Sequence, residues 1–199
     1  MVIDPEILLE FAAQEKHLVK DEILFNEGSS ALFYYQVADG IIKMNNYSED
    51  GQEFVQGMFK AGESFGEPPL FADFKYPANA VALVDSLVWK LSKENFINLL
   101  KNNFDLHLKF CAILSNRLQF KAMISKEISS HAPEHRILTL IDYFKEKSNG
   151  ESELFEVPFT RQQIADMAGL RVETVIRSIK SLAEKKELKI IKRKVYREF

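Results

Sequence analysis

Short apolar stretches separated by turn residues make up the chain from Lys20 to Leu91. They are rich in β-branched and aromatic residues, which favour strands, and most end at a glycine: EILFNEG, ALFYYQVADG, IIKMNNYSEDG, QEFVQGMFKAG and ANAVALVDSLVWKL. Asp50 with Gly51 predicts a tight hairpin, because both residue types tolerate the positive φ that such turns require. About seven short strands at this spacing predict an antiparallel β-roll of the sandwich or jelly-roll type.

The apolar pattern becomes helical after Leu91. Ser92 caps a first predicted helix, which runs to Leu100, and a longer helix without glycine or proline runs from Asn103 to Ser130. The long helix has two apolar faces, the first near heptad spacing: Phe104, Leu108, Cys111, Leu114, Leu118, Ala122 and Met123 on one, and Leu106, Phe110, Ile113, Phe120 and Ile124 on the other.

Two apolar faces on one helix need two partners. We expect one face to cover the roll and the other to pair with the same helix of a second copy, as a parallel homodimer. The predicted seam of this dimer consists of Leu108, Cys111, Leu114, Leu118 and Ala122. The alternative is a core helix that is covered on both sides within a monomer.

A break at His131, Ala132 and Pro133 ends the long helix, because proline disfavours helical geometry in the residue before it. A further amphipathic helix follows from Pro133 to Lys147, and the segment LFEVPFT after it has an extended pattern. These changes predict an α+β chain in three parts. They are a β-roll sensor domain over 1–102, a dimerisation helix over 103–131 and a C-terminal domain over 132–199.

The C-terminal part contains the spacing of a helix-turn-helix. Thr160 and Gln163 form the capping box T-x-x-Q at a helix start, and Gly169 can adopt the left-handed conformation that ends the helix. The inner faces of the two helices are then apolar or small: Ile164, Ala165 and Ala168 on the first, and Val172, Val175, Ile179 and Leu182 on the second. An ordinary helical hairpin can show the same spacing by chance.

The outer face of the second helix distinguishes these possibilities. Glu173, Thr174 and Arg177 project away from its apolar residues, as base-reading side chains do in the major groove. Glu173 and Arg177 are also four residues apart, so a surface ion pair is the alternative interpretation. The following segment LKIIKRKVYRE has the pattern of a β-hairpin wing. The predicted phosphate contacts are Thr160, Arg161, Arg171, Lys180, Lys192, Arg193 and Lys194.

The charge is distributed unevenly along the chain. Residues 160–199 contain 11 Lys and Arg against five Asp and Glu, whereas residues 1–159 contain 15 against 24. A basic C-terminal part on an acidic body fits DNA binding, although a solvated charged surface gives the same sum. The first residues carry Asp4 and Glu6 and lack the basic start of a secretory signal, and no apolar run is long enough for a membrane helix. We expect a cytoplasmic protein that binds double-stranded DNA and no membrane.

The order of roll, long helix and winged helix-turn-helix resembles the transcription regulators of the CRP/FNR family over nearly the whole chain. The resemblance rests on FNEG at 25–28, FGEPPLF at 65–71, NRLQ at 116–119 and TRQQIADMAGLRVETVIRSIK. It implies a dimeric, sequence-specific regulator that reads a palindrome and contacts RNA polymerase. Glu173 and Arg177 match the residues that read a TGA-like half-site core. Val172 and Ile176 depart from the family pattern, which leaves the outer bases open.

The sensor part departs further from the cyclic-nucleotide binders of this family. Glu67 matches the glutamate that these proteins direct at the ribose, but Pro77 and Ala78 replace their Arg-Ser pair for the cyclic phosphate. Neither residue can supply the cation that a buried phosphate requires, so we expect no tight binding of cyclic AMP. The resemblance places a pocket for an unidentified small-molecule effector around Gly66, Glu67, Pro77, Ala78, Leu118, Lys121 and Ala122.

Two other sensor chemistries of the family depend on cysteine and histidine. An iron-sulfur cluster is not expected, because Cys111 is the only cysteine; it is expected to be a buried packing residue. Haem is not excluded, since His17 and His107 are available as axial ligands, although a lone histidine is more often a surface or packing residue.

Two other classes of function compete with a DNA-binding regulator. An enzyme is not favoured, because the sequence shows no catalytic triad order, phosphate loop or metal-ligand spacing, and Glu67 has no evident acid-base partner. A ligand-binding roll that acts only through protein partners, without specific DNA binding, is the second alternative.

Overall fold

The computed structural model describes residues 1–49, 51, 53–148 and 153–199. They form two compact units, Met1–Arg117 and Leu118–Phe199. The hairpin that the sequence predicts at Asp50 and Gly51 includes Asp50, which lies outside the described residues.

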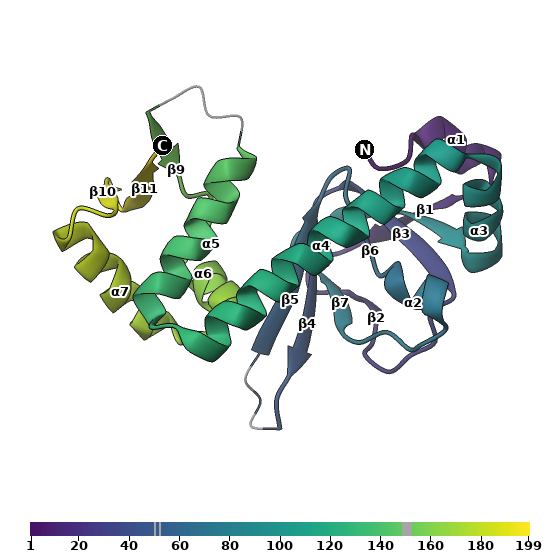
Figure 1. The fold of residues 1–199 in the computed structure, drawn as a ribbon. Coiled ribbons are helices and arrows are strands. Elements are labelled where there is room, and N and C mark those ends of the chain that lie inside the picture. Colours follow the sequence, from purple (N-terminus) through teal and green to yellow (C-terminus); the bar gives the residue numbers. More distant parts are fainter. Residues whose placement is uncertain (50, 52, 149–152) are drawn as a thin grey trace. The chain divides into compact units, whose positions relative to one another are not determined.

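Two four-stranded antiparallel sheets build the first unit (Figure 1). One sheet has the order β1 (Gln14–Leu18), β8 (Ser86–Ser92), β3 (Phe33–Asp39) and β6 (Ser64–Phe65), and the other has the order β2 (Ile23–Phe25), β7 (Asn79–Ala82), β4 (Ile41–Tyr47) and β5 (Glu53–Lys60). The predicted antiparallel β-roll is therefore confirmed. The sequence pattern missed β1, because this edge strand is mostly polar and exposed.

Strand β3 is buried on both faces, which explains its nearly continuous apolar sequence. Tyr35 points into the roll, where its ring lies 5.7 Å from that of Phe65. Tyr34 points the other way and stacks on Phe96 at 4.4 Å, while Phe110 meets Tyr34 edge-on at 5.7 Å. The same strand thus joins the interior of the roll to the helices outside it.

Four helices accompany the roll: α1 (Pro5–Glu10), α2 (Pro68–Ala72), α3 (Lys93–Asn102) and the first part of α4 (Phe104–Ser130). The predicted cap of α3 is confirmed, because the Ser92 hydroxyl accepts a hydrogen bond from the backbone N–H of Asn95. The short helices α1 and α2 were not predicted, since six and five residues are too few to show a helical period.

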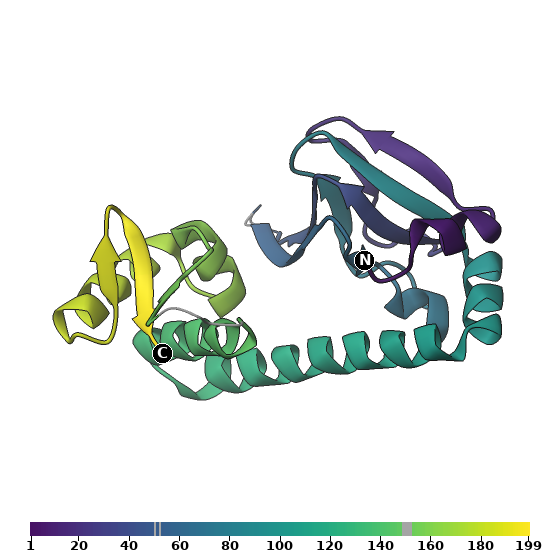
Figure 2. The same cartoon turned by 90° about the horizontal axis from the view of Figure 1, so that it is seen from above.

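The second unit contains the end of α4, three further helices and a small sheet. The helices are α5 (Pro133–Lys147), α6 (Arg161–Ala168) and α7 (Val172–Glu184), and the sheet has the order β10 (Lys189–Ile191), β11 (Lys194–Glu198) and β9 (Leu154–Glu156). Figure 2 shows α4 as one continuous helix, after which the chain turns into α5. None of the helices in the described part of the chain has the length and apolar character that crossing a membrane requires.

Candidate nucleic-acid interface

Helix α6 begins and ends as its sequence predicts. The Thr160 side chain accepts a hydrogen bond from the backbone N–H of Gln163 at 3.1 Å, and the Gln163 side chain accepts one from the Thr160 N–H at 2.8 Å. Gly169 ends the helix with φ of 63°, and a Cβ there would lie 3.1 Å from the side chain of Ile128. Glycine is therefore required both by the backbone conformation and by the close approach of α4.

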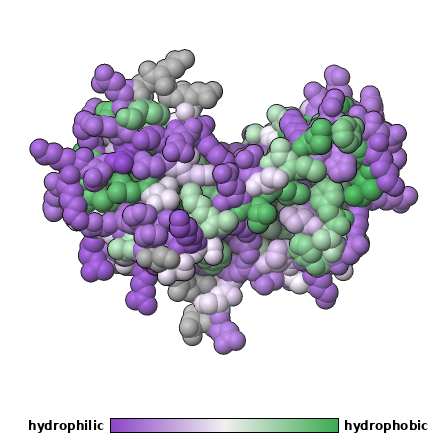
Figure 3. Space-filling model, in the orientation of Figure 1, coloured by the Kyte–Doolittle hydropathy of each residue, from purple (hydrophilic) through white to green (hydrophobic). Residues whose placement is uncertain are grey.

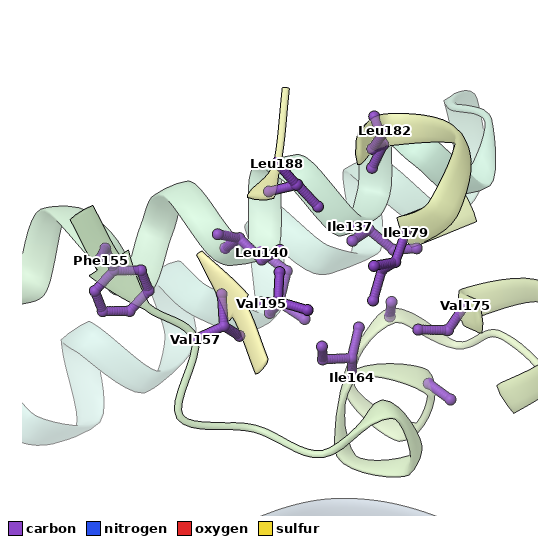
Figure 4. Close-up of a cluster of buried hydrophobic side chains, with 13 residues drawn as sticks. Ile137, Leu140, Phe155, Val157, Ile164, Val175, Ile179, Leu182, Leu188 and Val195 are labelled. Carbon is purple, nitrogen blue, oxygen red and sulfur yellow. The ribbon is translucent and has the colours of Figure 1, made fainter. Parts of the chain in front are cut away.

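A single apolar core fixes α7 against α5 and α6 (Figure 4). The α7 residues Val175, Ile179 and Leu182 are at most 2% exposed, and they pack with Ile137 of α5 and Ile164 of α6. The predicted inner faces are confirmed. Truncating one of these branched side chains to alanine typically costs about 2 to 5 kcal/mol, so the core holds the opposite face of α7 in a defined orientation.

The opposite face of α7 presents side chains to solvent. Glu173, Ile176, Arg177 and Lys180 are exposed and Thr174 is half-buried. Neither Glu173 nor Arg177 forms a hydrogen bond or ion pair with any residue that the structure describes, so the surface ion pair left open by the sequence is not present. A carboxylate and a guanidinium one helical turn apart are thus both available to a ligand.

The hairpin of β10 and β11 has a strained and basic tip. Ile191 and Lys194 pair across a two-residue turn in which Lys192 has φ of 47° and Arg193 has φ of 69°. Positive φ at both central residues is what type I′ turns require, and such turns usually contain Asn and Gly. Placing two long cations there costs backbone energy, and both side chains are exposed at the tip.

The predicted phosphate-binding residues differ in their surroundings. Lys194 Nζ lies 2.5 Å from Glu156 Oε1, so its charge is already paired within the small sheet. Arg161 is half-buried, burial lowers the pKa of its guanidinium, and it donates a hydrogen bond to the Arg193 carbonyl at 3.3 Å. It therefore supports the turn of the hairpin. Of the predicted phosphate contacts, Arg171, Lys180, Lys192 and Arg193 are exposed, and their side chains form no hydrogen bond or ion pair with any residue that the structure describes.

Glu67, a residue of the predicted effector pocket, is completely buried and is bound by a residue of the same chain. Arg117 of α4 donates a hydrogen bond from Nη1 to Glu67 Oε2 at 2.8 Å and another from Nη2 to the Ser64 carbonyl at 2.6 Å. The Arg117 guanidinium also lies 5.3 Å from the ring centre of Phe59. Sequence reasoning missed Arg117, because its partner lies 50 residues away and only the fold brings the two together.

Aromatic rings occupy the interior of the roll beside Glu67. Phe25 and Tyr76 stack with ring centres 3.7 Å apart, and a Cβ on Gly66 would lie 3.2 Å from Tyr76. Ala78 is buried, whereas Pro77 is exposed and its carbonyl accepts a hydrogen bond from Asn46.

The remaining predicted sensor residues are on surfaces. Leu118, Lys121 and Ala122 belong to the second unit, where all three are exposed on α4. His17 and His107, the candidate haem ligands, are also exposed and do not point into the interior of the roll.

The two apolar faces of α4 have different environments. On one face, Phe110 is completely buried in the first unit, and Phe120 and Ile124 pack on the core of the second. The other face is exposed, and Figure 3 shows green and pale residues among purple ones along α4. Of the predicted seam, Leu108 is 52% and Leu118 69% exposed, Cys111 and Ala122 are exposed, and Leu114 is half-buried. The expectation that Cys111 is buried is wrong for the single chain.

Comparisons with known proteins agree with this architecture. Residues 15–103 match the model of the cyclic nucleotide-binding domain, and residues 135–197 match that of the Crp-like helix-turn-helix domain. The cyclic AMP receptor protein of Thermus thermophilus is 27% identical over 161 residues, which cover 81% of this chain and 73% of that protein. The transcriptional activator protein Anr of Pseudomonas protegens is 24% identical over 177 residues, covering 87% and 72%.

Solved structures show the same fold. FixK2 from Bradyrhizobium japonicum superposes with a TM-score of 0.73 at 20% identity, covering 94% of this chain and 92% of that chain. The β-roll, long helix and winged helix-turn-helix together define a transcription regulator with a DNA-binding domain at its C-terminal end. The chain belongs to the CRP/FNR family of transcription regulators.

Proposed function

We propose that this protein is a homodimer that reads an inverted repeat with a TGA-like half-site core. The observation that carries the proposal is the pair of Glu173 and Arg177, exposed and unpaired on the face of α7 opposite the core. Arginine can donate two hydrogen bonds to O6 and N7 of guanine, and a carboxylate can accept one from the amino group of cytosine. Thr174 lies beside them and supplies a hydroxyl to the same base edges.

Contacts to phosphates would set the position of α7 on the duplex. Arg171 at the start of α7 and Lys180 two turns later flank the base-reading residues, and Lys192 and Arg193 extend the positive surface to the wing. Thr160, Arg161 and Lys194 were predicted for the same role. Their hydrogen bonds to Gln163, Arg193 and Glu156 favour a supporting role in holding the two helices and the wing.

Dimerisation would occur along the exposed face of α4. Phe104, Leu108 and Leu118 expose more than half of their side chains at intervals near the heptad, alongside Cys111 and Ala122. Burying such a stripe against its own copy is favourable, at roughly 25 cal/mol per Å² of apolar surface. A parallel pair of helices would supply the two-fold symmetry that an inverted repeat requires.

The effector of this regulator would not be cyclic AMP. Arg117 already satisfies one oxygen of Glu67, Pro77 and Ala78 offer no cation, and aromatic side chains surround Gly66. Isothermal calorimetry should detect no binding of cyclic AMP in the micromolar range. We further expect action in the cytoplasm, contact with RNA polymerase and no catalytic activity, as for other regulators of this family.

Selection of bound sequences from random DNA tests the site, its symmetry and the spacing of half-sites together. We expect an inverted repeat with a TGA-like core, bound with the steep salt dependence of phosphate contacts. Replacing Arg177 by Ala should cost about 1 to 3 kcal/mol of binding and relax the preference at one base pair. Replacing Lys180 by Ala is the matched control, and it should weaken all sites about equally.

Two outcomes would contradict the proposal. Equal weakening of all sites by R177A would remove the base-reading role of Arg177. The absence of specific DNA binding, with or without extract of the host cell, would favour a ligand-binding roll that acts through protein partners.

A further inference from the structure

Three potential metal ligands surround the break between α4 and α5. Glu127 lies in the last turn of α4, His131 directly follows that helix, and His135 lies in the first turn of α5. Glu127 Oε2 is 2.6 Å from His135 Nδ1 and 3.4 Å from His131 Nδ1, and the two imidazole rings stack with centres 4.2 Å apart. The three side chains therefore meet at the junction of α4 and α5, on both sides of Pro133.

Two ligand-bearing groups of this cluster are buried. Glu127 is 5% exposed, and the Nδ1 atom of His131 is buried without a hydrogen-bond partner among the described residues. A buried carboxylate and a ring nitrogen without a hydrogen bond thus lie at the same junction.

We propose that Glu127, His131 and His135 bind a divalent transition-metal ion of the zinc type. Their three ligand atoms all lie within 4.8 Å of one another. Tetrahedral zinc with bonds of about 2.0 to 2.1 Å needs ligand atoms about 3.3 Å apart, which small side-chain rotations would reach. Two imidazoles and one carboxylate suit zinc, nickel, copper or cobalt, whereas magnesium and calcium prefer sites made of oxygen alone. His131 and His135 are partly exposed, so an ion can enter from solvent.

The site lies where it can influence the DNA-binding helices. Arg136 donates hydrogen bonds to the carbonyls of His131 at 2.9 Å and Ile128 at 2.7 Å, which ties α5 to the end of α4. Glu134 forms an ion pair with Lys185 directly after α7, and Ile137 of α5 packs in the core shared with α7. A metal bound to both α4 and α5 would fix the angle at this junction and change the affinity for DNA. This second step rests on the proposed function.

Direct metal binding tests the site without DNA. The 199-residue chain, without a tag and after treatment with a chelator, is titrated with Co²⁺, and the visible absorption of bound cobalt reports the binding. Zn²⁺ is then added to displace the cobalt. We expect one ion per chain for the wild type. His131→Gln and His135→Gln should each weaken binding at least about tenfold.

The other two histidines provide a matched control. The chain contains four histidines, so the double variant H17Q/H107Q removes the same residue type from exposed positions elsewhere and should bind as the wild type does. Circular dichroism verifies that each variant is folded. No bound ion in the wild type, unchanged binding in both H131Q and H135Q, or loss of binding in H17Q/H107Q would overturn the site.

DNA affinity tests the coupling. The DNA sequence obtained by selection from random DNA is titrated with protein at constant ionic strength, with and without saturating Zn²⁺. The dissociation constant of the protein–DNA complex should change at least about threefold for the wild type and should not change for H135Q. Metal binding without this change would overturn the coupling alone. Failure of the proposed function would appear as no specific DNA binding in either condition, while the cobalt titration would still decide the metal site.

Discussion

Arg117 of α4 and Glu67 of the roll form an ion pair with 2.8 Å between Nη1 and Oε2, although their sequence positions are 50 residues apart. The carboxylate is completely buried, whereas 32% of the Arg117 side chain is exposed. Burying a carboxylate is costly unless it is paired, so the guanidinium from α4 compensates the burial of Glu67 inside the roll. In this protein, the position that resembles a ribose ligand therefore joins the β-roll to the long helix.

Loss of the arginine should destabilise the first unit. Arg117→Met keeps the packing on Phe59 but leaves the Glu67 charge unpaired, and we expect the free energy of unfolding to fall by about 2 to 4 kcal/mol. Glu67→Gln alone should cost less, and the double variant less than the sum of the two, because the unpaired charge is then absent. Urea unfolding at fixed protein concentration measures these values. Additive effects would show that the ion pair contributes little.

The burial of Tyr35 inside the roll should raise the pH at which this tyrosine loses its proton. Burial raises the pKa of Tyr35 to about 12 from the usual 10.0. The unfolded chain loses this proton first, so the stabilising contribution is complete below pH 10 and disappears as the pH rises towards about 12. Tyrosinate absorbance should show one late-titrating group fewer in Tyr35→Phe than in the wild type. An unchanged late phase in that variant would show that Tyr35 is open to water.

The single cysteine offers a test of the dimer. In a parallel, in-register pair of α4 helices, Cys111 would face Cys111 of the second copy, within reach of a disulfide. Mild oxidation should therefore give a covalent dimer on a denaturing gel without reductant, and Cys111→Ser should not. Leu118→Glu should weaken the dimer at least about tenfold in sedimentation experiments, since it places two carboxylates in the seam. A cross-link that forms equally well in L118E would contradict this seam.

The outer bases of the half-site should depend on Ile176. This side chain is 40% exposed between Glu173 and Arg177, on the face of α7 for which we propose base reading. An exposed aliphatic side chain in the major groove favours the methyl group of thymine. Replacing one thymine of the selected half-site by uracil should therefore weaken the wild type by roughly 0.8 kcal/mol, the value of one buried methylene-sized group, and should not weaken Ile176→Ser. Equal sensitivity of both proteins to uracil would exclude this contact.

The C-terminal reader was predictable because it depends on neighbours along the chain. The capping box of Thr160 and Gln163, the left-handed Gly169 and the apolar spacing of α7 all act within a few residues, so the sequence contains their physical cause. The exposed positions of Glu173 and Arg177 follow from that spacing. The roll was also predictable in type, since β-branched and aromatic stretches between turns favour strands in any topology, but its polar edge strand β1 was not.

The sequence by itself therefore determined the kinds of elements, the helix ends and the residues that α7 presents to solvent. The tertiary structure alone decided which charged side chains remain available to a ligand. Arg117 pairs with Glu67. Lys194, which the sequence predicts as a phosphate contact, pairs with Glu156, 38 residues away. The tertiary structure also decided that α4 leaves one apolar face uncovered and that Glu127 meets two histidines across a helix break. Local geometry follows from adjacent residues, whereas pairing and burial depend on which distant segments the fold places in contact.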